Sequence, residues 1–246
     1  MTEKIKINDI DIAVSESGSG SPLILIHGRA FSKEMMGRVS DHYSGRFHVY
    51  SYDVRGHGES SKPGAFTMED HVEDLKGLVG YYGMEGPAVI GLSMGSFIAL
   101  KTAEKYPELF SKIVLIGTRG KSRPASEEPG PDEMTSKVFA PHITADEIDG
   151  FYTDIAGPVL LTDAERAAIG ESLQDFDLLA EAYKVKAPVL VLTGEHDGMS
   201  EPRTAREVAD ALPNARFESI PKAGHIAFFE NPERVFELMD EFLGTE

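Results

Sequence analysis

Residues 87–100 read PAVIGLSMGSFIAL, and this stretch decides the fold. It begins with an apolar run typical of a buried strand, and the apolar residues after Ser93 indicate a helix. Gly91-Leu92-Ser93-Met94-Gly95 fits the pattern G-x-S-x-G, in which a sharp turn exposes the serine oxygen above a sheet. A side chain at Gly91 or Gly95 would crowd the strand and helix where they meet. We therefore predict that Ser93 is a nucleophile.

Length and charge restrict the classes of function. The 246 residues suffice for one large α/β domain or two small ones. Asp and Glu total 41 against 24 Lys and Arg, so the formal net charge is −17, and nucleic acid is not expected as a partner. No apolar run approaches the roughly 20 residues that span a bilayer, and the first residues lack the apolar core of a secretory signal. Cysteine is absent, which excludes disulfides and thiolate chemistry. We expect a cytoplasmic protein without a membrane partner.

Short apolar runs alternate with helical patterns along most of the chain. This alternation predicts an α/β fold with a mostly parallel central sheet and helices on both faces. Functional residues should gather at the carboxyl ends of the strands, where the loops after Ile26, Tyr52, Leu92 and Leu192 converge. The expected strands are 5–7, 10–14, 23–26, 47–52, 87–92, 110–116, 189–192 and 215–220, and helices are expected at 72–82 and from Pro232 onward.

One segment interrupts the alternation. Residues 119–186 contain no strand-like run, begin with the Pro- and Gly-rich stretch 121–131, and continue with short amphipathic stretches. We predict an inserted helical cap at 119–186 and a core domain formed by 1–118 and 187–246. The cap has apolar residues that need burial, namely Val138, Phe139, Phe151, Tyr152, Val159, Leu160, Leu161, Leu178 and Leu179.

A serine nucleophile needs a base that takes its proton and a carboxylate that orients the base. His225 is the best-placed histidine, because it follows the last predicted strand and the neighbouring Gly224 allows a close backbone approach. Asp197, in the loop after the strand at 189–192, is the favoured acid. Glu195 competes for that role, although it more plausibly packs against or caps nearby backbone. The remaining histidines show no metal-ligand spacing, so no metal is predicted.

Two backbone N–H groups should stabilise the developing oxyanion. Met94 follows the nucleophile and supplies one. The second is expected from the loop 27–31, where we select Arg29. The Arg29 side chain could reach the mouth of a pocket and attract a substrate carboxylate, point to solvent, or pair with one of the acids.

Together these residues resemble the α/β-hydrolase family, in its serine esterase and lipase-like branch with a short cap. The matching segments are His27-Gly28, 52–60, Gly91–Gly95, Gly194–Asp197 and Gly224-His225, so the resemblance covers nearly the whole chain. It implies the order nucleophile, acid, histidine, here Ser93, Asp197 and His225. It also implies that His27 braces the oxyanion loop and that residues 55–58 form a structural turn.

The resemblance implies hydrolysis of small to medium carboxylic esters or lactones without a cofactor. Ser93 stands where related dehalogenases and epoxide hydrolases have aspartate, so those two activities are not expected. Ile226 stands where carbon–carbon bond hydrolases commonly have tryptophan, which disfavours that activity without excluding it. The alternatives are a carbon–carbon hydrolase, an amidase or aminopeptidase, a perhydrolase, and a ligand-sensing or signalling protein that retains the triad. Oligomeric state is left open. The expected pocket residues are Arg29, Phe31, Phe139, Phe151, Leu160 and Ile226.

Overall fold

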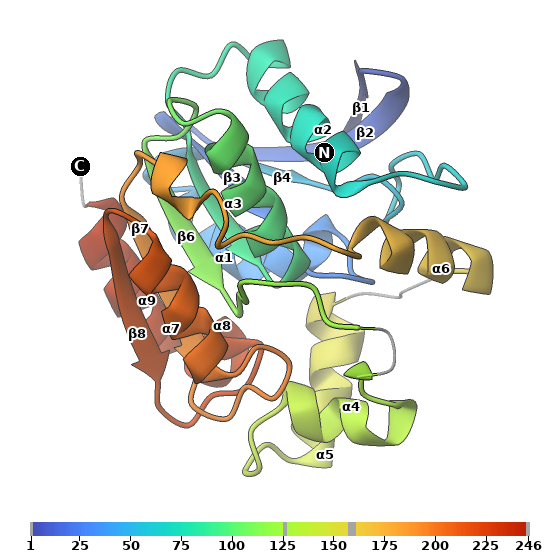
Figure 1. Ribbon diagram of the computed structural model, residues 1–246, viewed down its shortest axis with the longest axis vertical. Coiled ribbons are helices and arrows are strands. Elements are labelled where there is room, and N and C mark those ends of the chain that lie inside the picture. Colours follow the sequence, from blue (N-terminus) through green and yellow to red (C-terminus); the bar gives the residue numbers. More distant parts are fainter. Residues whose placement is uncertain (1, 125–126, 157–160, 245–246) are drawn as a thin grey trace.

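The computed structural model describes residues 2–124, 127–156 and 161–244. Within these ranges eight strands form one sheet. They are β1 (Thr2–Ile7), β2 (Ile10–Gly18), β3 (Ser21–Ile26), β4 (Phe47–Tyr52), β5 (Ala88–Leu92), β6 (Lys112–Ile116), β7 (Val189–Gly194) and β8 (Ala215–Ile220). Their spatial order is β1-β2-β4-β3-β5-β6-β7-β8. β2 pairs antiparallel with β1 and β4, and every other pairing is parallel, which confirms the predicted α/β-hydrolase fold (Figure 1).

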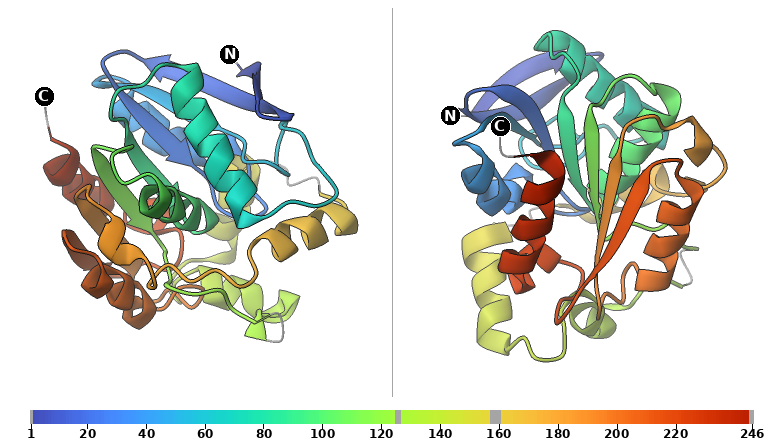
Figure 2. Two further views of the ribbon diagram at one scale, coloured as in Figure 1. Left: turned by 45° about the horizontal axis from the view of Figure 1, so that its top comes forward. Right: turned by 90° about the vertical axis from the view of Figure 1, so that its left-hand side faces the viewer.

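Helices cover both faces of the sheet (Figure 2). On one face lie α2 (Met68–Tyr81), α3 (Met94–Lys105) and α7 (Pro202–Ala211), and on the other lie α1 (Gly37–Tyr43), α8 (Ala227–Glu230) and α9 (Pro232–Leu243). Short 3-10 helices are η1 (Lys33–Met36) and η4 (Ala182–Lys184).

The continuous apolar run in β3 fills the cores on both faces. Because successive side chains of a strand point to opposite faces, Ile24 and Ile26 join the core under α2 and α3, whereas Leu23 and Leu25 join the core under α1 and α9. All four side chains are fully buried. Full burial of such side chains contributes about 1.5–3 kcal/mol each, and burial on both faces of the sheet explains why residues 23–26 are all apolar.

The described part of residues 119–186 contributes no strand to the sheet. It contains α4 (Pro131–Val138), α5 (Ala145–Gly150), the π-helical turn η3 (Phe151–Ala156), α6 (Asp163–Ser172) and η4, plus one isolated bridge between Lys121 and Asp177. The Phe151 ring contacts Phe31 and Phe229 of the core, with centroid distances of 6.1 and 5.0 Å. These contacts fix η3 against the core, and we retain 119–186 as the proposed extent of the cap.

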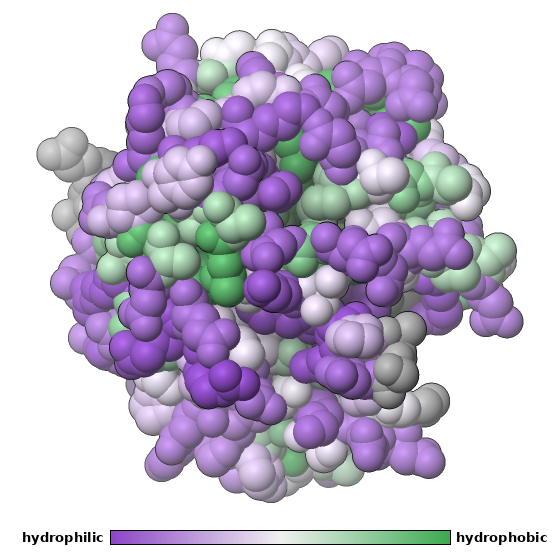
Figure 3. Space-filling model, in the orientation of Figure 1, coloured by the Kyte–Doolittle hydropathy of each residue, from purple (hydrophilic) through white to green (hydrophobic). Residues whose placement is uncertain are grey.

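The surface carries mostly polar side chains. Figure 3 shows hydrophilic residues over most of the face seen in Figure 1, interrupted by small hydrophobic areas. Among the helices of the described ranges, none has the length and apolar character required to cross a membrane.

Candidate active site

Ser93 lies on a strained turn between β5 and α3. Its backbone has φ 51° and ψ −115°, a conformation that a non-glycine residue rarely adopts. A Cβ at Gly91 would lie 2.4 Å from the Gly95 carbonyl oxygen, and one at Gly95 would lie 2.3 Å from the Ile26 oxygen. Only glycine fits at both places. The turn is therefore encoded by the two glycines and holds Ser93 at the carboxyl end of the central strand.

Asp197 and His225 form a buried hydrogen bond. His225 Nδ1 donates to Asp197 Oδ2 at 2.8 Å, and the two residues are 6% and 3% exposed. The second carboxylate oxygen of Asp197 accepts the N–H groups of Met199 at 2.8 Å and Ser200 at 2.7 Å. Asp197 is thus fixed on both oxygens, and the Nε2 atom of His225 is left to face the site.

Glu195 occupies a different place. Its carboxylate accepts the Lys222 N–H at 3.2 Å, and its side chain is about half exposed. Glu195 makes no contact with His225 in the described hydrogen bonds. The structure therefore pairs the histidine with Asp197 and places Glu195 against backbone.

The loop after β6 links Ser93 to His225. The Ser93 N–H donates to the Ile116 carbonyl at 2.8 Å. A Cβ on the next residue, Gly117, would lie 2.8 Å from His225 Cε1, so the imidazole rests against this glycine. No direct hydrogen bond joins Ser93 Oγ to His225 in the described structure; such catalytic bonds often tighten only when substrate is bound.

Glu230 is a site residue that sequence reasoning missed. Its Oε2 accepts the Gly224 N–H at 3.0 Å and the Ala140 N–H at 2.8 Å, and the His225 N–H donates to the Val138 carbonyl at 2.6 Å. Burial raises the pKa of the Glu230 carboxyl. These bonds tie the histidine loop to the segment after α4. Nothing in the sequence around Glu230 distinguishes it from an ordinary acid on a short helix.

The loop after β3 lies against the nucleophile. A Cβ on Gly28 would be 3.6 Å from Ser93 Cβ, and Ala30 has a positive φ of 63°, so the chain turns sharply beside Ser93. In the described part of the chain, neither the Arg29 N–H nor the Met94 N–H has a hydrogen-bond acceptor. Met94 is the first residue of α3, where N–H groups have no partner within the helix. Two free donors therefore flank the serine.

His27 holds this loop through its neutral ring. Nε2 accepts the Val54 N–H at 3.0 Å, so the proton must lie on Nδ1, which donates to the Gly28 carbonyl at 2.8 Å. Burial lowers the pKa of His27 to about 4. Burial likewise lowers the pKa values of His57 and His71 to about 3. These three histidines are neutral and structural at pH 7.

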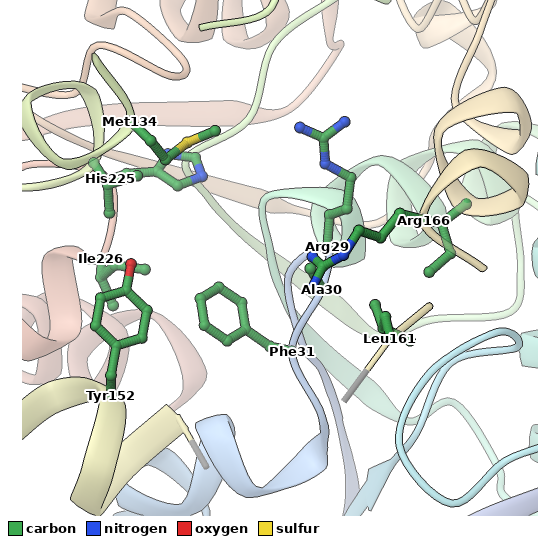
Figure 4. A pocket seen from close by; sticks show the side chains of 11 residues that line it. Arg29, Ala30, Phe31, Met134, Tyr152, Leu161, Arg166, His225 and Ile226 are labelled. Atoms are coloured by element: carbon green, nitrogen blue, oxygen red, sulfur yellow. The ribbon is translucent and has the colours of Figure 1, made fainter. Parts of the chain in front are cut away.

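A cavity of about 650 Å³ opens beside His225 (Figure 4). Its wall is mostly apolar, and its polar groups are two arginines, the Tyr152 hydroxyl and His225. Figure 4 shows Phe31 between Ile226 and Tyr152 on one side and Leu161 and Arg166 on the other. The lining residues are Arg29, Ala30, Phe31, Met134, Val138, Tyr152, Leu161, Arg166, Ile169, His225 and Ile226.

The predicted pocket residues separate into three groups. Arg29, Phe31 and Ile226 line this cavity. Phe139 and Phe151 do not belong to its lining; they are buried and pack edge to face with centroids 5.5 Å apart. The two rings pack against each other in the hydrophobic core and do not face the cavity. Leu160 lies outside the described residues.

The Arg29 side chain pairs with an acid of the cap segment. Its Nη2 atom lies 2.9 Å from Glu128 Oε2, and the two side chains are 35% and 23% exposed. Arg29 also borders a second, smaller cavity that contains Ser93. No group of three or more His, Asp or Glu side chains in the described ranges could hold a metal ion.

Comparison with known proteins places these features in a family. A family model described as the alpha/beta hydrolase family matches residues 23–238. A Mycobacterium tuberculosis protein with the provisional name non-heme bromoperoxidase BpoC is 30% identical, over 96% of this chain and 98% of its own length. The pimeloyl-[acyl-carrier protein] methyl ester esterase of Nitrosomonas europaea is 27% identical, over 93% of this chain and 98% of its own.

A solved structure shows the same fold. A thermophilic esterase from Thermogutta terrifontis, solved with malate bound, superimposes with a TM-score of 0.86 at 28% identity. The match covers 99% of this chain and 98% of that one.

Proposed function

Because the chain belongs to the alpha/beta hydrolase family, we propose that it is a serine hydrolase that cleaves carboxylic esters or lactones of small to medium size. The hydrogen bond between Asp197 and His225 beside the Ser93 turn carries this proposal. The esterase names of two similar proteins agree with the ester bond as target.

The first half of the reaction forms an acyl-enzyme. His225 Nε2 takes the proton of Ser93 Oγ as this oxygen attacks the carbonyl carbon of the ester. Asp197 holds the required tautomer and stabilises the imidazolium that results. When the tetrahedral intermediate collapses, the bond to the leaving oxygen breaks and His225 returns the proton to the alcohol.

The second half releases the acid. Water loses a proton to His225 and attacks the acyl-enzyme, and the Ser93–acyl bond breaks with return of that proton to Ser93. The N–H groups of Arg29 and Met94 are the proposed donors to the oxyanion in both halves. Donors of this kind contribute about 3–4 kcal/mol each to the transition state. These steps need no cofactor.

The large cavity is proposed to hold the apolar part of the substrate. Apolar walls with a few placed polar groups are typical of small-molecule sites. Three residues connect this wall to the catalytic loops. Arg29 and Phe31 belong to the loop of the proposed oxyanion hole, and Ile226 follows His225 in the sequence.

Perhydrolysis is a second candidate, favoured by the name of the BpoC relative, because bromoperoxidases consume hydrogen peroxide. In this reaction hydrogen peroxide would replace water in the attack on the acyl-enzyme and release a peracid. The triad and the acyl-enzyme would be the same.

A substrate panel tests the proposal. Purified wild-type and Ser93→Ala protein are assayed with p-nitrophenyl esters, lactones, amides and a carbon–carbon diketone. We expect esters and lactones to be turned over fastest, with a loss of several orders of magnitude in a folded Ser93→Ala protein. Turnover of esters by the Ser93→Ala protein near the wild-type rate would contradict a serine mechanism. Faster turnover of the diketone or amide would assign a different bond.

A further inference from the structure

A second, polar cavity borders Ser93. Its volume is about 30 Å³, and its lining includes Ser93, Met94 and Phe97. Its charged residues are Arg29, Arg119, Arg123 and Glu128. Three guanidinium groups therefore surround one carboxylate within reach of the nucleophile, in a chain whose formal net charge is −17.

Two of these arginines approach Ser93 from opposite sides. Arg29 lies in the loop after β3 and Arg119 in the loop after β6, and these strands flank β5, which ends at the nucleophile. Arg119 is held in place: Nε donates to the Lys121 carbonyl at 3.2 Å, Nη1 to the Met199 carbonyl at 3.4 Å, and the guanidinium lies 5.3 Å from the Phe97 ring. The same topology that positions the serine thus positions two cations beside it.

Glu128 satisfies these cations only in part. Its Oε2 hydrogen-bonds to Arg29 at 2.9 Å, but its Oε1 lies 3.8 Å from Arg119 Nη2, beyond hydrogen-bond distance. The Arg119 side chain is 15% exposed, so its charge is largely desolvated. Burial, together with the neighbouring Arg123, lowers the pKa of Arg119 to about 10, which leaves it protonated at neutral pH. A buried cation with an incomplete partner is costly, and a closer carboxylate would stabilise it.

The Arg123 guanidinium has another acceptor. It donates to the Met199 carbonyl at 2.9 Å, and the Met199 N–H in turn donates to Asp197. Asp197, the other nearby carboxylate, is fully engaged by His225 and by backbone. Arg119 also donates to the Met199 carbonyl, but its Nη2 atom lies 3.8 Å from Glu128, and Arg29 pairs with the same Glu128. Arg29 and Arg119 are therefore the two cations that a further anion would meet once Glu128 leaves.

We propose that this cavity is a carboxylate subsite and that Glu128 occupies it until a substrate carboxylate displaces it. The inference rests on the proposed hydrolysis at Ser93 and deepens it. The substrate class is the half-ester of a short dicarboxylic acid. Its free carboxylate bridges Arg29 and Arg119, its ester carbonyl lies at Ser93, and its apolar alcohol extends into the large cavity.

The small volume of the polar cavity requires that one carboxylate leave before another enters. A volume of about 30 Å³ holds little more than one water molecule, so a carboxylate enters only when Glu128 leaves. Glu128 is 23% exposed and can be solvated on withdrawal. One guanidinium–carboxylate pair then replaces another.

Two esters of matched shape test the subsite: butyl hemisuccinate, and butyl 4-methylpentanoate, in which an isopropyl group replaces the carboxylate. We expect the wild-type kcat/KM to favour the hemisuccinate by about tenfold or more, because hydrogen bonds between charged groups are the strong class. Arg119→Gln should bring this ratio toward one. A wild-type ratio near or below one would overturn the proposal.

Glu128→Gln should have the opposite effect to Arg119→Gln and improve the use of the hemisuccinate. It also changes a part-exposed side chain instead of a largely buried one. It should lower KM for the hemisuccinate by at least about threefold, the scale of a part-exposed ion pair. Glu127→Gln removes the same charge from the adjacent exposed position and is the matched control. An equal decrease in both variants, or a higher KM in Glu128→Gln, would contradict displacement of Glu128.

A binding measurement separates this proposal from the proposed function. In a Ser93→Ala background, the dissociation constants of the two esters are measured without turnover. Tighter binding of the hemisuccinate, improved by Glu128→Gln, supports the subsite even if the ester bond proves not to be the native target. Equal binding of both esters, with normal Ser93-dependent hydrolysis of the neutral ester by wild type, overturns the subsite and leaves the serine hydrolase intact.

Discussion

Lowering the pH from 7 to 5 should destabilise this protein, because three histidines are buried in the neutral form. His27, His57 and His71 are each at most 1% exposed. Burial holds their pKa values at about 4, 3 and 3, against 6.5 for a solvated histidine. The unfolded chain therefore binds protons in this interval that the folded chain does not. Stability is fully present above pH 6.5 and is lost as the pH falls toward the folded pKa values.

The size of the effect follows from linkage. Each histidine withdraws about 2 kcal/mol between pH 7 and pH 5, so the three together withdraw about 6 kcal/mol. Glu104 acts in the opposite direction: burial raises its pKa from 4.5 to about 7, so the folded state is the one that binds its proton as the pH falls. That offsets about 2 kcal/mol. The net loss of about 4 kcal/mol is a large part of the 5–15 kcal/mol typical of a folded domain.

Urea unfolding at both pH values measures this loss directly. The free energy of unfolding should fall by several kcal/mol, with an unchanged m-value if the transition remains two-state. Glu104→Gln removes the opposing proton and should increase the difference between the two pH values toward 6 kcal/mol. Equal stability at pH 7 and pH 5, or greater stability at pH 5, would refute the neutral burial of these histidines.

Two further predictions concern the geometry around His225. Gly117→Ala should lower kcat by about a hundredfold, because the new Cβ would lie 2.8 Å from the imidazole of His225. Gly86→Ala is the control. Gly86 has a similar positive φ, but a Cβ there would meet no atom nearer than 3.8 Å, so kcat should stay near the wild-type value. Asp197→Asn should reduce kcat by roughly 10³–10⁴, whereas Glu195→Gln should change it little, since only Asp197 orients the ring. Steady-state ester hydrolysis checks both; similar losses within either pair would show that the contacts described here do not govern catalysis.

The sheet and the serine turn were predictable because their signals are local. Continuous apolar runs such as 23–26 and 189–192 are typical of buried strands, and Gly91 and Gly95 indicate the turn between strand and helix. The hydrogen bond between Asp197 and His225 was also anticipated, because loops at the same edge of a parallel sheet must meet.

Three core helices escaped prediction: α8 has only four residues, and α1 and α7 bury only a few side chains each. α7 buries only small or β-branched residues, namely Ala205, Val208 and Ala209, and α1 buries only Val39 and Tyr43. Such sparse apolar stripes resemble polar loops in sequence. Tertiary packing against the sheet stabilises α1 and α7.

Two other contacts between distant segments have no signal in the sequence. Glu230 meets Ala140 and Glu128 meets Arg29 across 90 and 99 residues. Neither acid differs in sequence from the many exposed acids of this chain. Only the fold shows that each faces the site.

Active-site labelling tests the central claim most directly. The folded protein is treated with a fluorophosphonate, which reacts with activated serines, and the modified residue is located by mass spectrometry of its peptides. We expect a single stoichiometric adduct on Ser93, formed much more slowly in Asp197→Asn because the base is no longer oriented. An unlabelled Ser93 in active protein, or an adduct on another residue that abolishes hydrolysis, would contradict a serine nucleophile at this turn.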